Sequence, residues 1–188
     1  TASTATVHKL EDVLKVFAQI QVRIHAHSHP IARRLLKDVD NAAKKRDNAT
    51  VVPALKAAAQ VLRLCDDETL TLEYDRQRAF YEYHRGHPDE ALELTRSIML
   101  RSLALSSTVN EYHLADAGNY VSSLFRLNRA REARKICRST LVLADELAHT
   151  PTYNWLLWLD GLIDFALGDI WPGLSKAQQA YAHLGERG

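Results

Sequence analysis

The chain has 188 residues, of which 46% are hydrophobic and 25% charged, a balance that fits a folded globular protein and excludes intrinsic disorder. Its 24 Lys and Arg residues nearly match its 23 Asp and Glu residues, so net charge gives no reason to expect a nucleic-acid or membrane-surface protein. Only 7 Gly and 5 Pro residues interrupt it, which predicts long helices. Cys65 and Cys137 lie far apart without metal-ligand spacing, which argues against disulfides or zinc and favours the cytoplasm.

We expect no targeting or membrane-spanning segment in this chain. Residues 1–6 contain neither a basic segment nor an apolar run, so they do not resemble a signal peptide. The most apolar stretch, residues 155–163, is interrupted by Asp160 and is too short to span a bilayer. The chain does not begin with Met, and we expect it to be a fragment of a longer protein.

Helical periodicity begins with an apolar stripe that predicts a first helix ending near Ala26. Pro30 suits the first position of a second helix, which is predicted to run to about Lys45. Thr50 is a candidate cap for a third helix that continues to roughly Leu64. The residues of the first stripe are Val7, Leu10, Leu14, Phe17 and Ile24.

The central part of the chain predicts three further helices. A fourth begins at residues 66–67, where a carboxylate can cap it, and ends at Gly86. Pro88 opens a fifth helix, and the capping-box pattern of residues 108–111 opens a sixth. Asn128 is placed to end the sixth helix, because Asn tolerates the left-handed conformation.

The C-terminal part predicts the last three helices. A seventh has an apolar stripe that ends at Leu147, and residues 150–151 cap and begin an eighth, which stops at Gly168. The ninth extends to Leu184. About nine helices without any strand pattern make this an all-α chain.

The helix stops recur at a regular interval. Gly86, Asn128 and Gly168 are 42 and 40 residues apart, and each joins two helices by a short turn. A small residue that permits close helix packing follows each stop by five positions: Ala91, Ala133 and Gly173. This periodicity predicts a repeat protein.

The residues around these stops follow one pattern. Positions 84–86 (His-Arg-Gly) are followed by 89–91 (Asp-Glu-Ala), and positions 127–128 (Leu-Asn) by 131–133 (Arg-Glu-Ala). This pattern resembles the turn and the start of the second helix in the tetratricopeptide repeat family. Small residues elsewhere also match that family: Ala79, Val121, Gly161, Ala177 and Ala180.

The resemblance covers residues 68–184 most clearly, and the long repeats are similar to those of kinesin light chains and of large bacterial signalling and transcription regulators. It implies a right-handed helical-hairpin solenoid that forms a single domain over residues 1–188, with divergent helices at 7–65 and clearer repeats at 66–185. The segment 181–188 looks like the start of another repeat, as expected of a fragment.

The family resemblance also implies where a partner would bind. In such solenoids the first helix of each pair lines a concave groove that holds a peptide or another protein. Aromatic residues and arginine are common anchors of interfaces, although the aromatic ones can instead pack between neighbouring helices. The candidate groove residues are Arg76, Phe80, Tyr83, His84, Ser122, Phe125, Arg126, Trp155 and Trp158.

Two other surfaces offer alternative functions. A basic stripe could bind phosphates or nucleic acid, or it could be a solvated face that meets acidic residues of the neighbouring repeat. Residues 155–167 are apolar nearly all round, so this helix is covered on more than one side, either by adjacent helices or by a partner segment or a second copy of the chain in a homodimer. The basic stripe consists of Arg131, Arg134, Lys135 and Arg138.

No pattern in the sequence indicates catalysis, a cofactor or a metal site. His25, His27 and His29 alternate, which places them on different faces of a helix end. Asp160 and Asp164 resemble a carboxylate pair but lack a third ligand, and no phosphate-binding loop occurs. We therefore expect a non-enzymatic protein- or peptide-binding module, in a sensory, regulatory or scaffold region of a larger bacterial signalling protein.

Overall fold

The computed structural model describes residues 4–45, 47–106, 108–148 and 150–185. For residues 4–14, 25, 48, 150 and 183–185 it describes the backbone only. Within these residues every regular element is an α-helix and no strand occurs, which confirms the all-α class. The helices are α1 (Thr4–Lys44), α2 (Asn48–Leu62), α3 (Glu68–His84), α4 (Pro88–Leu105), α5 (Glu111–Arg126), α6 (Ala130–Glu146), α7 (Thr150–Ala166) and α8 (Ile170–Gly185).

The prediction of about nine helices is wrong by one, because the first two predicted helices are a single helix, α1. Pro30 lies inside α1 instead of opening a new helix. A proline there removes one hydrogen bond to the carbonyl of Ala26, but residues 25–29 contain no Gly or Asn that could reverse the chain. Pro30 alone was therefore insufficient to end the helix.

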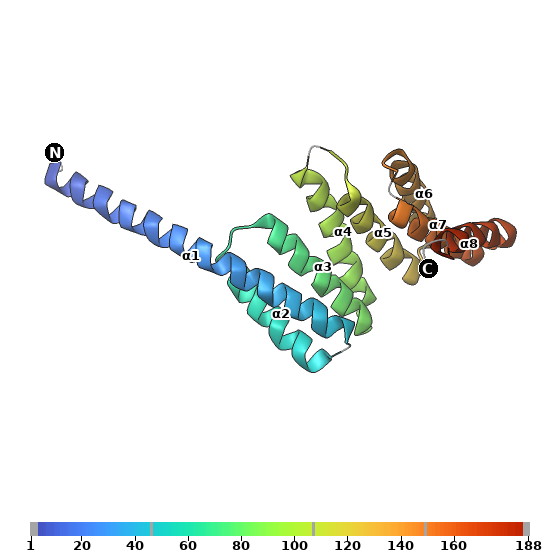
Figure 1. Cartoon of the computed structure of the whole chain (residues 1–188), viewed down its shortest axis with the longest axis horizontal. Helices are drawn as coiled ribbons and strands as arrows, with labels where there is room; N and C mark the ends of the chain where they lie inside the picture. The colour runs from blue at the N-terminus through green and yellow to red at the C-terminus, as the bar shows by residue number, and fades with distance from the viewer. Residues whose placement is uncertain (1–3, 46, 107, 149, 186–188) are drawn as a thin grey trace. The chain divides into compact units, whose positions relative to one another are not determined.

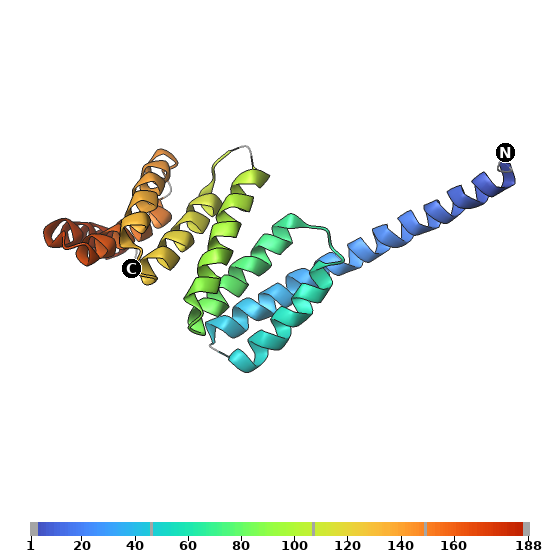
Figure 2. The ribbon, with the colours of Figure 1, turned by 180° about the vertical axis from the view of Figure 1, so that it is seen from behind.

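Contacts between Cα atoms divide the chain into two compact units, residues 1–77 and residues 78–188, with the boundary inside α3. In the first unit, α2 lies alongside the C-terminal half of α1 (Figures 1 and 2). Its core joins α1, α2 and the start of α3 through Ala32, Leu36, Ala58, Leu62, Cys65 and Leu70. Asp47 caps α2 by accepting a hydrogen bond from the backbone N–H of Thr50, so Thr50 is not itself the cap.

The N-terminal half of α1 extends beyond α2, as both views show (Figures 1 and 2). Phe17 and Ile24 of the predicted apolar stripe are exposed there, and the side chains of Val7, Leu10 and Leu14 lie outside the described residues. Among the described residues, none of the helices combines the length and the apolar character that a membrane span requires.

In the second unit, the predicted stops end their helices in the same way. Gly86, Asn128 and Gly168 have positive φ angles of 82°, 60° and 89°. After each of them, the next backbone N–H donates to the carbonyl five residues back, at 2.9 to 3.0 Å, as in Schellman-type helix ends. The regular stops predicted from the sequence are confirmed as structurally equivalent turns.

The helices of the second unit pack in chain order from α4 to α8, and α7 also contacts α5. Their main core includes Leu124 of α5, Cys137 of α6, and Leu156 and Ile163 of α7, all fully buried. α7 therefore packs against both helices of the preceding pair, α5 and α6.

Small residues bring the backbones of α7 and α8 close together. A Cβ atom on Gly173 would lie 2.7 Å from the carbonyl oxygen of Gly161, and a Cβ on Gly161 would lie 2.9 Å from that of Gly173. On α5, a Cβ on Gly118 would lie 2.2 Å from the ring of Trp155. These glycines are therefore required by packing, with Gly118 making room for the indole of α7.

Candidate functional site

Four of the predicted groove residues meet in one patch of the second unit, which we call the α3–α5 cluster: Phe80, Tyr83 and His84 of α3 with Arg126 of α5. The ring centroids of Phe80 and His84 are 4.3 Å apart, and those of Tyr83 and His84 are 5.2 Å apart, both edge-on. The guanidinium carbon of Arg126 lies 3.8 Å from the centroid of the Tyr83 ring, in a cation–π contact. Phe80 is 50% exposed, and both His84 and Arg126 are exposed.

Two polar groups of the α3–α5 cluster are unsatisfied within the described residues. No carboxylate there pairs with Arg126, and partial burial lowers the pKa of its guanidinium. The hydroxyl of Tyr83 is buried and has no hydrogen-bond partner in the same part of the chain. A ligand with a carboxylate or carbonyl oxygen could satisfy Arg126 while keeping its stacking on the Tyr83 ring.

Arg126 also lines a pocket of about 700 Å³ at the turn between α5 and α6, together with Phe125, Arg131 and Leu167. Arg129 lines it too, but its guanidinium donates to Glu132 at 2.8 and 2.6 Å. The lining therefore carries a net excess of positive charge beside an apolar wall. Such a lining is suited to an acidic side chain next to an apolar one.

The remaining predicted groove residues lie elsewhere. Arg76 is half-buried in the first unit, with its guanidinium 3.6 Å from Glu73. Ser122 is half-buried, and Phe125 and Trp155 pack against the main core, as the alternative interpretation of the aromatics expected. Trp158 is 44% exposed and lines a second pocket, described below.

The basic stripe of α6 is partly neutralised by carboxylates of α7 and of the turn that follows it. Arg138 donates to Asp164 at 3.2 Å, and Arg134 donates to Asp169 at 2.8 Å. Arg131 and Lys135 are exposed. Arg134 and Arg138, two of the four predicted stripe residues, thus pair with acidic groups of the neighbouring helix pair.

Asp160 and Asp164 form a buried ion cluster with Lys176 of α8. Lys176 donates to both carboxylates, whose side chains are 2% and 0% exposed. Burial alone would lower the pKa of the Lys176 ammonium, but hydrogen bonds and charges from the two carboxylates outweigh burial and raise it. This cluster joins α7 and α8, and it explains why two acidic residues interrupt an apolar helix.

Cys137 lies beside this ion cluster and is fully buried. Its thiol donates to the carbonyl of Leu156 at 3.4 Å. Burial, with a smaller effect of the Asp160 charge, raises the pKa of the Cys137 thiol to about 12. A thiol with this pKa is a packing group and not a nucleophile.

The second pocket lies between α7 and α8 and has a volume of about 680 Å³. Trp155, Trp158 and Tyr181 supply its aromatic walls, and Ala177 is among its small residues. Asn154 also lines it; this residue is 4% exposed, and its side-chain carbonyl oxygen has no hydrogen-bond partner among the described residues. We call this feature the α7–α8 pocket.

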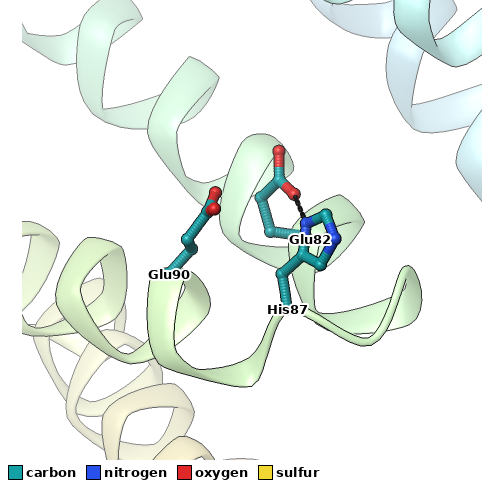
Figure 3. A group of neighbouring side chains, drawn as sticks. All are labelled: Glu82, His87 and Glu90. Atoms are coloured by element: carbon teal, nitrogen blue, oxygen red, sulfur yellow. Dashed lines mark hydrogen bonds and ion pairs between the residues drawn. The ribbon is translucent and has the colours of Figure 1, made fainter.

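A mixed carboxylate and histidine cluster occurs at the start of α4. Nδ1 of His87 lies 2.8 Å from a carboxylate oxygen of Glu82, and Glu90 of α4 lies beside them (Figure 3). One potential ligand atom from each residue lies within 4.8 Å of the others. The groups are at least partly exposed, and Glu90 also complements the positive end of the α4 dipole, so this arrangement needs no metal to explain it.

Comparison with known proteins gives no family assignment. No protein-family model matches the chain, and no significant match appears among curated proteins or among solved structures. The functional argument therefore depends on the chain's own geometry.

Sequence reasoning missed the α7–α8 pocket and the partners of the carboxylate pair. One signal for the pocket was present: Ala177 follows Gly168 by nine residues, as Cys137 follows Asn128. Cys137 contacts α7, and the equal spacing places Ala177 on the corresponding face of α8, where it lines the pocket. The signal for Asn154 was weaker, because an isolated Asn in a helix gives no indication of its burial.

Proposed function

We propose that the chain is a protein- or peptide-binding module of tetratricopeptide-like helical pairs and that the α3–α5 cluster is its binding site. The observation that supports this most is Arg126, which is held on the face of Tyr83 and has no carboxylate partner among the described residues. An arginine with a fixed orientation and no carboxylate partner is a typical interface anchor.

The ligand that fits this site is a peptide segment with an acidic residue beside an apolar or aromatic one. The acidic residue would form a charge-assisted pair with Arg126, which lines the neighbouring pocket with the exposed Arg131. The apolar residue would contact Phe80, which is half exposed, and His84. Binding of this kind is recognition without chemistry, so no enzymatic activity is proposed.

The basic stripe supports a phosphate-binding function less well. Arg134 and Arg138 already pair with carboxylates, and a phosphate would have to compete with these internal partners. For the setting, we propose a sensory, regulatory or scaffold region of a larger cytoplasmic signalling protein of bacterial type, as the resemblance of the repeats implies.

The proposal can be tested by selecting ligands from a library of displayed random peptides. We expect the enriched peptides to share an Asp or Glu next to an apolar residue. Each should bind the Arg126→Ala variant at least about tenfold more weakly, because a hydrogen bond to a charged group contributes roughly 1.5–3 kcal/mol.

The matched control is Arg96→Ala, because Arg96 is an exposed arginine of α4 outside the α3–α5 cluster. Its replacement should leave peptide affinity within about twofold of the original. A library that yields no enriched peptide, or peptides that bind the Arg126→Ala variant equally well, would refute the proposed site.

A further inference from the structure

The pocket at the turn between α5 and α6 carries more positive charge than its own residues neutralise. Arg126, Arg129 and Arg131 line it, and Glu132 is the one acidic residue among the described lining residues. Arg129 already binds Glu132 through hydrogen bonds of 2.8 and 2.6 Å. Within the described part of the chain no carboxylate pairs with Arg126 or Arg131, so two guanidinium charges remain for a ligand.

The start of α6 adds to the positive potential of this pocket. Residues 130–132, which form the first turn of the helix, all line the pocket. Arg129 occupies the N-cap position and makes no side-chain hydrogen bond to that turn. Because arginine has no acceptor atom in its side chain, it cannot satisfy the backbone N–H groups as Ser or Asp would. The helix dipole also favours a negative charge at this end.

The two guanidinium groups approach the pocket from different helices. Arg126 belongs to α5 and Arg131 to α6. Arg126 is held 3.8 Å from the centroid of the Tyr83 ring, and this stacking uses the face of the guanidinium. Its N–H donors lie in the guanidinium plane, so they can still bind oxygen atoms of a ligand. Phe125 and Leu167 supply the apolar wall beside these charges.

A phosphate monoester matches this charge better than a carboxylate does. A phosphorylated side chain carries about −1.5 to −2 charges at neutral pH and offers three acceptor oxygens, whereas Asp or Glu carries a single charge. A phosphate can therefore accept hydrogen bonds from both guanidinium groups at once and neutralise both of them. A lone carboxylate would leave one of the two positive charges without a partner.

We propose that the acidic residue of the bound peptide is a phosphorylated serine or threonine, whose phosphate lies in this pocket between Arg126 and Arg131. This inference rests on the proposed function, because the apolar residue beside the phosphate contacts Phe80 and His84 of the α3–α5 cluster. Arg126 belongs to both surfaces, so one short peptide reaches both. A polynucleotide fits less well, because its many phosphates need a longer run of cations than this pocket supplies.

The test is a fluorescence anisotropy titration of the full chain with three mixtures of degenerate peptides. All three have an apolar residue next to a fixed central residue, which is phosphoserine, glutamate or serine. We expect the phosphoserine mixture to bind at least about tenfold more tightly than the glutamate mixture, because the second guanidinium adds charge-assisted hydrogen bonds. The serine mixture should bind most weakly.

Two variants make the test specific to this pocket. Arg131→Gln should reduce the preference for phosphoserine over glutamate to less than about threefold, because Arg126 alone remains to bind the extra charge. Arg131 is exposed, so this replacement leaves the fold intact, which circular dichroism can check. The matched control is Lys135→Gln, which removes an exposed cation of α6 outside the pocket and should leave the preference within about twofold of the original.

The possible results separate this inference from the proposed function. Equal affinity for the phosphoserine and glutamate mixtures would overturn the inference and leave acidic-peptide binding at Arg126 intact. A preference that persists in Arg131→Gln, or one that is lost in Lys135→Gln, would overturn it in the same way. Tighter binding of a single-stranded oligonucleotide than of the phosphoserine mixture would also contradict it. Failure of every peptide mixture to bind would refute both the inference and the proposed function.

Discussion

Replacement of Lys176 by Met tests the energetic role of the buried ion cluster. The Lys176 side chain is 22% exposed and donates to two carboxylates that are almost completely buried. After Lys176→Met, Asp164 would keep Arg138 at 3.2 Å, whereas Asp160 would keep only a 3.6 Å contact with the same guanidinium. Arg134 also lies 3.6 Å from Asp164 but is closer to Asp169, so Arg138 is the nearest cation left to the two buried carboxylates in the variant.

Removing one partner of a buried ion pair costs about 3–5 kcal/mol, and we expect the lower end because Arg138 can shift toward both carboxylates. A loss of about 3 kcal/mol in the free energy of unfolding lowers the melting temperature of a chain of this size by about 6–12 °C. Urea unfolding followed by circular dichroism measures this loss. Lys135→Met, at an exposed position of α6, is the control and should change stability by less than about 0.5 kcal/mol.

The pH dependence of this loss has a definite sign. The pKa of Lys176 is raised in the folded chain, so its contribution is complete below the ordinary value of 10.5 and is lost as the pH rises above it. The stability difference between the original chain and Lys176→Met should therefore be constant near neutral pH and shrink in strong alkali. A loss below about 1 kcal/mol at neutral pH would refute this description of the cluster.

Three further outcomes follow from the packing. Gly173→Ala should lower the free energy of unfolding by about 1–3 kcal/mol, since its Cβ would lie 2.7 Å from a backbone oxygen of α7; an unchanged urea midpoint would contradict the close approach. Pro30→Ala should raise stability by about 2 kcal/mol by restoring a helical hydrogen bond to Ala26, whereas a helix that ended at Ala26 would gain nothing. Cys137, with its pKa raised to about 12 by burial, should resist iodoacetamide in the folded chain and react in urea; rapid alkylation of the folded chain would show that its site is open.

Local signals predicted the helix ends of the second unit well. Gly86, Asn128 and Gly168 adopt the left-handed conformation that ends a helix, and few other residue types tolerate it. Ala148 shows the limit of such reasoning, because it has a φ of 50° after α6 although alanine gives no signal for that conformation. Its backbone N–H donates to the carbonyl of Asp145 at 2.9 Å, so the turn is held by hydrogen bonding that composition does not reveal.

The cap of α5 was predicted two residues too early and with different partners. Asn110, not Thr108, accepts hydrogen bonds from the backbone N–H groups of Tyr112 and His113, and His113 closes the capping box through Nδ1. Nε2 of His113 then donates to the carbonyl of Ser102. The acceptor of the Nε2 proton belongs to the neighbouring helix α4, so this arrangement depends on tertiary packing.

The candidate site was predictable only in part, because local spacing specifies which residues share a helix face but not how helices pack against each other. Helical spacing placed Phe80, Tyr83 and His84 together on α3, because residues three and four apart share one face. The contact of Arg126 with Tyr83 required knowledge of how α5 packs. The pairing of Arg138 with Asp164 likewise depends on the register of α6 against α7, which no local pattern specifies.

The most direct test of the binding proposal is a double-mutant cycle between Arg126 and the acidic residue of a selected peptide. Isothermal titration calorimetry would give the affinities of the original chain and of Arg126→Ala for the peptide and for its amide analogue, with Glu replaced by Gln. The proposal predicts a coupling energy of at least about 1 kcal/mol, because the two groups form a charge-assisted pair. A coupling energy close to zero would show that Arg126 does not contact the acidic residue and would contradict the assignment of the α3–α5 cluster as the binding site.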